Sequence, residues 1–494
     1  MKFSFMVIIF VCWFTLLTAK NIQLLEILNY INGDFGHQCE DDIALNFSNT
    51  VITSIGQNFI SSPLITCLNL TNIDIQSIQN GAFDKLPNLS QLFISNNNIK
   101  LNELFNFGGH EKLRVLILNN ATKTNYYYYY DNPHRFIVDI SKEYPNLEIL
   151  SLCANDIYSV QTSIKETPLP KLKILDLSNN HIRNNNFLKL LSNSLYFLDL
   201  HNNSLTSLAF DKKQVNLLVL YLNNNNLKYV KYNNTHKSFD SYNLNNQYKR
   251  LYGFNQHSSR EFDLYDYGLA MDGLENLHYL SISGNKIDFI LSNAFKYTDK
   301  LVYLNLSINN INYLHPDIFE NLQSLRWLDL SFNKFEDVPQ ISSEISALSL
   351  NCNNIKSLTA NAFAQMPKLI KLFLAGNQIV EINVKAFTQL LFLEVLDLSK
   401  NKLSFLPKGW SESLMSLKYL ILNDNKFISL ESLSLTSRVL LSLMEVHLGL
   451  NPLEYLDVSY FKNLPQNFTV NLTQVSNFAE CWNSNLCQDK ISLN

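Results

Sequence analysis

The stretch Leu325-Arg-Trp-Leu328-Asp-Leu330-Ser-Phe-Asn333-Lys-Phe335 contains the pattern from which the fold can be predicted. Leu328 and Leu330 alternate with residues that are not aliphatic, which is the two-residue period of a strand with one buried face. One such strand cannot bury its leucines alone, so neighbouring copies must stack into a parallel sheet with strands about 4.8 Å apart. Asn333 follows at a turn, where its amide can satisfy backbone groups of its own and adjacent coils. Such asparagines should form an internal ladder.

The same frame, L-x-x-L-x-L-x-x-N-x-L, recurs along the chain, and its regular copies are almost always 24 residues apart. They begin at Leu277, Leu301, Leu325, Ile345, Leu369, Leu393 and Leu417, and carry Asn285, Asn309, Asn333, Asn353, Asn377, Asn401 and Asn425. Further frames begin at Ile65, Leu89, Leu113, Leu147, Leu172, Leu195, Leu217 and Leu443. This period predicts a leucine-rich repeat solenoid of the α/β class: a horseshoe with a parallel sheet on its concave face, irregular or short helical convex segments, and a cap at each end. Phenylalanines late in the repeat should fill the convex half: Phe83, Phe295, Phe319, Phe363 and Phe387.

The length of 494 residues does not imply several globular domains, because a solenoid grows by adding coils. We expect one elongated domain. Its predicted parts are a signal peptide (1–19), an N-terminal cap with a degenerate first repeat (20–64), the repeats (65–455, with inserts at about 123–146 and 231–273) and a C-terminal cap (456–494).

The first residues have the pattern of a secretory signal: Lys2, an apolar run from Phe3 to Leu17, and Ala19 as the cleavage point. The alternative is a membrane anchor, for which the run is short. No other apolar stretch approaches the ~20 residues that span a bilayer, so we expect a secreted, extracellular protein without a membrane span. The net charge of −4 and the lack of a basic stripe argue against nucleic acid as a partner.

Two inserts interrupt the repeats. A run of five tyrosines, Tyr126 to Tyr130, can be interpreted as a low-complexity loop on the rim or as an aromatic binding patch. The segment from Lys231 to Gly273 shows neither a strand nor a helix period and is expected to be a long surface loop, either functional or disordered.

Six cysteines remain after Cys12 leaves with the signal, and an oxidising compartment favours disulfides among them. The expected cap pairs are Cys39 with Cys67 and Cys481 with Cys487. Cys153 and Cys352 lie in distant repeats, so they should be free thiols or links to another chain in a homo- or hetero-dimer. Nine N-x-S/T sequons predict a glycoprotein: Asn46, Asn69, Asn88, Asn120, Asn202, Asn233, Asn305, Asn467 and Asn471.

The sequence shows no nucleophile motif, no phosphate-binding glycine loop and no cluster with metal-ligand spacing, so we expect neither an enzyme nor a cofactor. Four aspartates occupy the middle exposed position of their strands: Asp176, Asp199, Asp329 and Asp397. They could be an acidic active surface, but the interpretation we favour is solvated filler.

Three successive repeats carry an aromatic residue before the second leucine, namely Tyr279, Tyr303 and Trp327. Stacked on the concave sheet, these side chains would form an anchor patch for a ligand, with little entropy lost on binding. Tyr221 should lie on the same face and Tyr419 at the same position of a later repeat. The alternative is that these bulky residues merely cover the sheet. The Asn305 sequon would place a glycan beside Tyr303.

The repeat frame, the phenylalanines of N-A-F and D-I-F and the cysteine-bearing caps together resemble the ectodomains of Toll-like receptors and secreted insect leucine-rich repeat immune proteins. The resemblance implies binding in innate immunity through the concave or lateral face of the solenoid, either as a recognition factor for a protein or microbial surface ligand or as a soluble decoy of Toll-type signalling. It departs from the family at Asn451-Pro452-Leu453, where the usual cysteine cluster is missing, and no transmembrane or signalling segment follows. The alternative function is a matrix or cell-adhesion protein.

Overall fold

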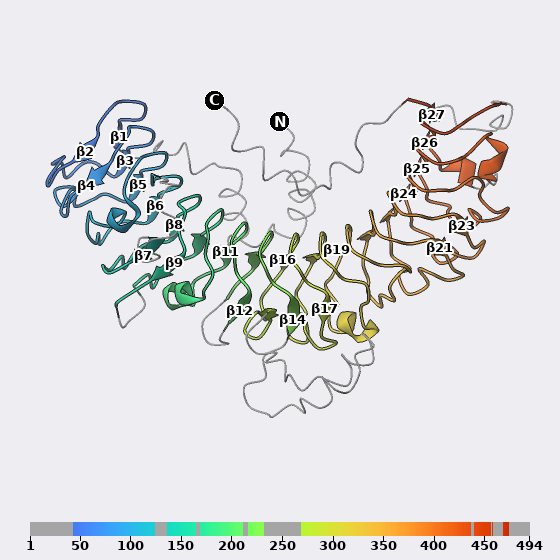
Figure 1. Cartoon of the computed structure of the whole chain (residues 1–494), viewed down its shortest axis with the longest axis horizontal. Coiled ribbons are helices and arrows are strands. Elements are labelled where there is room, and N and C mark those ends of the chain that lie inside the picture. Colours follow the sequence, from blue (N-terminus) through green and yellow to red (C-terminus); the bar gives the residue numbers. More distant parts are fainter. Residues whose placement is uncertain are drawn as a thin grey trace.

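The computed structural model describes residues 43–123, 136–164, 168–210, 216–231, 268–435, 439–455, 457 and 468–473. The predicted signal peptide, the tyrosine run at 126–130, most of the two caps and most of the second insert lie outside these ranges. Across the described residues the chain winds into an arc of coils, with the N-terminal coils at one end and the C-terminal coils at the other (Figure 1).

A 17-stranded sheet lines the inner side of the arc, with every strand parallel to its neighbours (Figure 1). This confirms the predicted solenoid. Successive pairings give the order β1 (Ala44–Asn46), β3 (Cys67–Asn69), β5 (Gln91–Phe93), β6 (Val115–Ile117), β8 (Ile149–Ser151), β10 (Ile174–Asp176), β11 (Phe197–Asp199), β13 (Val219–Tyr221), β16 (Tyr279–Ser281), β18 (Tyr303–Asn305), β19 (Trp327–Asp329), β20 (Ala347–Ser349), β22 (Lys371–Phe373), β24 (Val395–Asp397), β25 (Tyr419–Ile421), β26 (Glu445–His447) and β27 (Thr469–Asn471).

The core runs along the inside of the coils. Leu328 and Leu330 are fully buried, as the alternation in the sequence predicts. The phenylalanines expected on the convex half are at most 2% exposed, and the rings of Phe363 and Phe387 stack at 5.8 Å. The outer side carries two-stranded pairings, β2 (Ser54–Ile55) with β4 (Ser77–Ile78), β7 (Ile137–Asp139) with β9 (Ser159–Gln161), and β21 (Ser357–Leu358) with β23 (Glu381–Ile382). It also carries short 3-10 helices at Leu101–Glu103, Asn186–Leu190, Pro316–Phe319, Glu431–Leu433 and Val439–Leu441.

The internal asparagine ladder is confirmed. Nδ2 of Asn333 donates to the carbonyl oxygens of Leu330, in its own coil, at 3.1 Å and of Leu306, in the preceding coil, at 2.9 Å. Its Oδ1 accepts the backbone N–H of Ile311 at 3.0 Å. Asn309 repeats this pattern one coil earlier, with its Oδ1 accepting the N–H of Ile287. Each asparagine therefore ties two coils together through backbone groups that are shielded from water.

The second insert differs from a simple surface loop at both ends. Its first residue, Lys231, completes β14 (Tyr229–Lys231), and its last residues form β15 (Gly268–Ala270), all three of which are buried. The chain returns so that β15 lies between β12 (Ser207–Ala209) and β14, while β14 also pairs with β17 (Phe289–Ile290). Gly268 has φ +97, and a Cβ there would collide with the Tyr229 carbonyl oxygen, so the re-entry needs glycine.

No helix among the described residues is both long and apolar enough to cross a membrane.

Candidate functional site

Two rows of side chains from the main sheet face the concave side. Each strand is three residues long in the repeats concerned, and its middle leucine points into the core, so the first and third residues point the other way. The register aligns these residues from coil to coil: Tyr279, Tyr303 and Trp327 occupy the first position, and Ser281, Asn305 and Asp329 occupy the third.

The predicted aromatic ladder forms a continuous stack. The rings of Tyr279 and Tyr303 are 4.3 Å apart and nearly parallel, at 5°. Trp327 continues the stack at 6.1 Å and 22°, and Tyr221 joins its other end at 5.1 Å from Tyr279. Phe197 extends it by one more ring, 5.8 Å from Tyr221. All but Phe197 are half-buried, so the stack is an ordered wall on the concave sheet rather than a set of free side chains.

Of the two other tyrosines predicted for the binding patch, Tyr221 joins the aromatic stack and Tyr419 does not. Tyr221 is the third residue of β13 and contacts Tyr279, as expected for a neighbour on the same face. Tyr419 does lie at the ladder position, but Ala347, Lys371 and Val395 stand between it and Trp327. Four strand spacings, about 19 Å, therefore separate Tyr419 from the stack.

The sequence prediction did not include Phe197, although a signal for it was present. The frames that begin at Leu195 and Leu217 are consecutive and β11 pairs with β13, so no insert separates Phe197 from the coil of Tyr221. The aromatic residue at the first strand position of the frame at Leu195 could have placed Phe197 one coil from Tyr221.

The tyrosine hydroxyls are linked to each other and shielded from water. Hydrogen bonds connect Tyr279 with both Tyr303 and Tyr221. Burial raises the pKa of Tyr279 to about 12, although these hydrogen bonds oppose the shift. Burial likewise raises the pKa of Tyr303 well above its ordinary value, and the Asp329 carboxylate adds to the effect. Both phenols are therefore neutral at physiological pH.

The aspartates of the third strand position are not solvated filler, and that interpretation is wrong. Asp176, Asp329 and Asp397 are at most 8% exposed, and Asp199 is only partly exposed. Each accepts the backbone N–H of the residue two positions later, for example Ser331 to Asp329 at 2.9 Å, so the side chain closes an Asx turn at the end of the strand. In the sequence, a serine or histidine follows each of these aspartates by two positions, and this pattern could have predicted the turn.

Sequon asparagines use the same turn. Asn305 accepts the N–H of Ser307 at 2.9 Å, as Asp329 does in the next coil, and Asn46, Asn69 and Asn471 do likewise. The side-chain oxygen of the sequon asparagine thus closes a turn at these positions. Glycosylation stays a prediction at Asn46, Asn69, Asn88, Asn120, Asn202, Asn305 and Asn471, and the sites Asn233 and Asn467 lie outside the described residues.

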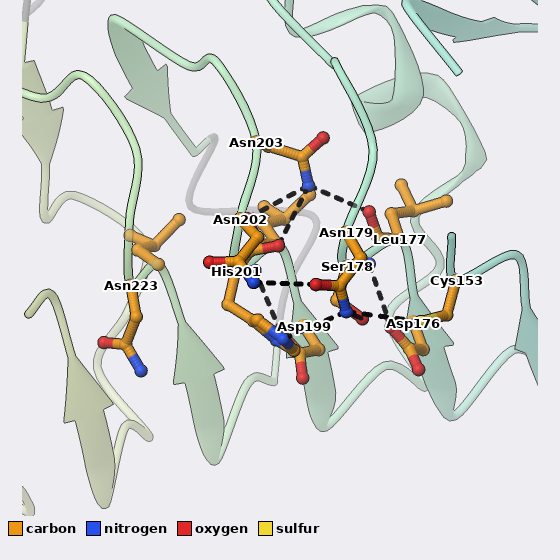
Figure 2. A network of polar contacts seen from close by, with 12 residues as sticks. Cys153, Asp176, Leu177, Ser178, Asn179, Asp199, His201, Asn202, Asn203 and Asn223 are labelled. Atoms are coloured by element: carbon orange, nitrogen blue, oxygen red, sulfur yellow. Dashed lines mark hydrogen bonds and ion pairs between the residues drawn. The ribbon is translucent and has the colours of Figure 1, made fainter. Parts of the chain in front are cut away.

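A polar network lies beside the N-terminal end of the ladder and draws on successive coils (Figure 2). His201 Nδ1 lies 2.7 Å from Asp199 Oδ1, and His201 Nε2 lies 3.2 Å from Asn179 Nδ2. Asn179 also contacts Cys153 Sγ at 3.4 Å and accepts from Asn202 at 2.7 Å. Since the Asn179 amide donates toward Nε2, the neutral tautomer with hydrogen on Nδ1 fits all these contacts.

This arrangement of Cys, His and Asp does not form an activated nucleophile. The Asn179 amide stands between the Cys153 thiol and the imidazole, and burial, with the nearby Asp176 carboxylate, raises the pKa of the thiol to about 11. The thiolate is the reactive form, so Cys153 is inert at neutral pH. Among the described residues, no group of three or more His, Cys, Asp or Glu side chains could hold a metal ion.

Cys153 and Cys352 both carry free thiols, and burial raises the pKa of Cys352 as well. Cys67 is disulfide-bonded, whereas Cys39, its predicted partner, lies outside the described residues, so that pairing stays a prediction. The predicted pair of Cys481 and Cys487 also lies outside them.

Comparisons with known proteins agree with this architecture. A leucine rich repeat family model matches residues 275–335, 343–391 and 371–427. Mimecan of Mus musculus is 33% identical over 153 residues, 31% of this chain and 48% of that protein. Toll-like receptor 2 type-1 of Gallus gallus is 35% identical over 114 residues, 23% of this chain and 14% of that protein. The chain therefore spans about half the length of the mimecans it matches.

Solved structures show the same fold at low sequence identity. The Toll–Spatzle complex of Drosophila gives a TM-score of 0.57 at 19% identity, covering 82% of this chain and 49% of that one. A leucine-rich repeat protein of Leptospira interrogans gives 0.51 at 21% identity, covering 78% of this chain and 91% of that one. The chain is thus a leucine-rich repeat protein that resembles Toll ectodomains. Proteins with this fold are typically non-catalytic.

Proposed function

We propose that the chain is a secreted, non-catalytic binding protein that recognises an extracellular protein or a microbial surface ligand through the concave face of its solenoid. The resemblance to Toll ectodomains, and to Toll in its complex with Spatzle, favours a protein ligand and a role in innate immunity, as a recognition factor or as a soluble decoy of Toll-type signalling. The signal-like N-terminus and the sequons support secretion.

The observation that carries this proposal is the stacked wall of Tyr221, Tyr279, Tyr303 and Trp327. Tyrosine and tryptophan are the residues most often found at the centres of binding interfaces, because they bury a large area while losing few rotamers. Here the rings already hold one another in place, so a ligand would meet a preorganised surface. Preorganisation reduces the entropy lost on binding.

The test is crosslinking capture from native extracellular fluid with the full chain and with a Tyr279→Ala, Tyr303→Ala, Trp327→Ala variant. The matched control replaces three exposed aromatic residues outside the concave rows, with Tyr313→Ala, Phe392→Ala and Phe405→Ala, which are 44%, 59% and 56% exposed. We expect the ladder variant to lose a partner that the wild type and the control both capture. Equal capture by all three folded proteins would contradict the proposal.

A second candidate, a matrix or adhesion protein that self-associates, is favoured by one feature. Exposed large apolar side chains are concentrated in the C-terminal coils: Val380, Val384, Leu391, Phe392, Phe405, Met415, Ile428, Leu441, Met444, Leu450 and Tyr455. Earlier coils within the described residues show only Tyr313 among the exposed large apolar side chains between residues 65 and 379. A mass in solution that rises with concentration, and returns to the monomer in a Phe392→Ser, Phe405→Ser variant, would support this candidate over the first.

A further inference from the structure

Two buried acceptor atoms lie in adjacent coils near the C-terminal end of the regular repeats. Asp397, at the end of β24, is 1% exposed, and its Oδ1 accepts the N–H of Ser399 at 2.9 Å. Its Oδ2 meets no donor within the described part of the chain. Asn423, just after β25, is 8% exposed, and its Oδ1 likewise meets no donor among those residues. Buried polar atoms without a partner are uncommon in folded proteins, and each of them calls for an explanation.

Both side chains belong to the concave side. Leu396 and Leu398 flank Asp397 and are fully buried in the core, as is Leu422 before Asn423. Because side chains alternate across a strand, Asp397 and Asn423 must point away from that core. The backbone N–H of Lys400 bonds to the carbonyl of Asn423 at 2.8 Å, which fixes the two coils side by side.

The charge of Asp397 is not matched by a cation in direct contact. Burial raises the pKa of its carboxyl group, and the more distant Lys400 and His447 oppose this shift. Lys418 Nζ, another ammonium group in the adjacent coil, already lies 2.8 Å from Glu394, and Lys400 is an exposed residue that makes no ion pair with Asp397 in the described part of the chain. An additional cation with several N–H donors would satisfy Asp397 Oδ2 and Asn423 Oδ1 together.

Aromatic residues lie on the two strands that flank the strand of Asp397. Phe373 is directly opposite Asp397 in the register of β22 and β24. Tyr419, at the start of β25, is half-buried and lies two positions before Ile421, the neighbour of Asp397. Such rings pack well against the methylene stem and planar head of an arginine side chain.

The polar groups match a peptide better than an isolated metal ion. Asn351 Nδ2, after β20, is a buried donor that meets no acceptor within the described ranges, whereas its Oδ1 accepts from Ala375 at 2.7 Å. A metal ion offers nothing to such a donor, but a peptide carbonyl does. A peptide thus supplies donors for the two buried acceptors and an acceptor for the buried donor.

We propose that Phe373, Asp397, Tyr419 and Asn423 form a subsite for an arginine side chain of the protein ligand. The proposal rests on the concave-face binding function and names part of the ligand's chemistry. The guanidinium group donates to Asp397 Oδ2 and Asn423 Oδ1, while its stem packs between the aromatic rings. Three strand spacings, about 14 Å, separate this subsite from Trp327, a distance that about four or five extended residues span. The same peptide can therefore reach both places.

The test compares two small probes, Nα-acetyl-arginine methylamide and Nα-acetyl-citrulline methylamide, which have similar shape and differ in charge. Their dissociation constants for the full chain are measured by saturation-transfer NMR. We expect the wild type to bind the arginine probe about tenfold more tightly, which is the effect of one charge-assisted contact. Asp397→Asn should bring the ratio close to one, and Asn423→Asp should raise it above the wild-type value.

The control is Asp424→Asn, which removes an exposed carboxylate next to Asn423 and should leave the ratio unchanged. Asp397→Asn should fold, because an amide can accept the Ser399 N–H as Asn305 accepts that of Ser307. Equal binding of the two probes to the wild type, binding of neither, or an equal loss in the control would overturn the subsite. If the crosslinking experiment still showed that partner capture depends on Tyr279, Tyr303 and Trp327, the arginine subsite would be rejected but the proposed concave-face binding function would not.

Discussion

The coils before and after the second insert differ at the residue that precedes the ladder asparagine. In the coil of β11, before the insert, this residue is Asn202, with φ 52. In the coil of β18, after the insert, it is Ile308, with φ 51. The backbone is the same in both, and so is the buried residue that follows, Asn203 or Asn309. The coils of the two halves thus have the same buried asparagine. They differ in the residue before it, a left-handed position that we call the edge of the coil.

Before the insert, this left-handed position holds asparagine in most of the described coils, with Ala154 as the exception in the coil of β8, and the asparagines form a second, outer row. Asn202 donates to Asn179 at 2.7 Å, and Asn224 donates to Asn202 at 2.7 Å. After the insert, this left-handed position holds residues of many kinds: Gly284, Ile308, Phe332, Cys352, Gly376, Lys400, Asp424 and Leu450. Asparagine and glycine suit a left-handed backbone, whereas a β-branched residue is strained there. The difference suggests that the inner ladder is required by the fold and that the outer edge is free to vary.

The largest effect that distinguishes the two rows should come from the inner ladder. Asn333→Ala removes hydrogen bonds to Leu306, Leu330 and Ile311, leaving buried backbone groups without partners. We expect a loss of roughly 3 kcal/mol or more in the free energy of unfolding, measured in urea. Asn203→Ala, in the other half, should cost a similar amount, because Asn203 bonds to backbone groups in the same way.

The matched control is Asn202→Gly in the outer row. Glycine keeps the left-handed backbone, so the variant loses mainly two side-chain hydrogen bonds, the one that Asn202 donates to Asn179 and the one that it accepts from Asn224, which together should cost about 1 to 2 kcal/mol. An outer-row loss as large as that of Asn333→Ala would show that the two rows do not differ as proposed.

A smaller effect should appear as a pH dependence at the third strand position, where Asp329 and Asn305 are neighbours. Burial raises the pKa of Asp329 to about 6, from 3.8, although hydrogen bonds from Ser331 oppose the shift. Between about pH 4 and 6 the folded protein therefore binds more protons than the unfolded chain, so this group's contribution to stability falls as pH rises through that window.

Asp329→Asn has no carboxyl group to titrate and can keep the turn to Ser331, as Asn305 keeps its own to Ser307. Relative to the wild type, the variant should gain roughly 2 kcal/mol of unfolding free energy between pH 4 and pH 7. Urea unfolding at both pH values measures this gain. A difference between variant and wild type that does not change with pH would argue against a raised pKa.

Much of the fold can be predicted from the leucine and asparagine spacing, because every repeat buries one face of its strand and the asparagine at the turn that follows. The spacing could not reveal that β15 returns between β12 and β14, since Gly268–Ala270 lacks the frame and pairs on the outer side. The buried state of Asp397 was also missed. An aspartate before a leucine looks solvent-facing in a single strand, and only the stacking of neighbouring coils encloses it.

The candidate site was predicted in part. Tyr279, Tyr303 and Trp327 share a register because three regular repeats carry them, which the sequence shows directly. The frame count already places Tyr419 four strands from Trp327, so its separation from the stack could also have been predicted. The spacing does not supply side-chain conformations, and these decide which rings touch: Phe197, at a first strand position, contacts Tyr221, at a third.

The smallest expected effect concerns the edge itself. Ile308→Asn would give the coil of β18 the outer residue of the β11 coil and should relieve strain of roughly 1 kcal/mol at φ 51. Ile308 is half-buried, so the loss of its apolar contacts offsets part of that gain. The control Ile308→Val keeps a β-branched side chain and should show no gain, while Asn202→Ile should lose roughly 1 to 2 kcal/mol. If Ile308→Asn instead lowers the free energy of unfolding measured in urea, the apolar contacts of Ile308 outweigh its backbone strain. The edge position after the insert is then constrained by packing and is not free to vary.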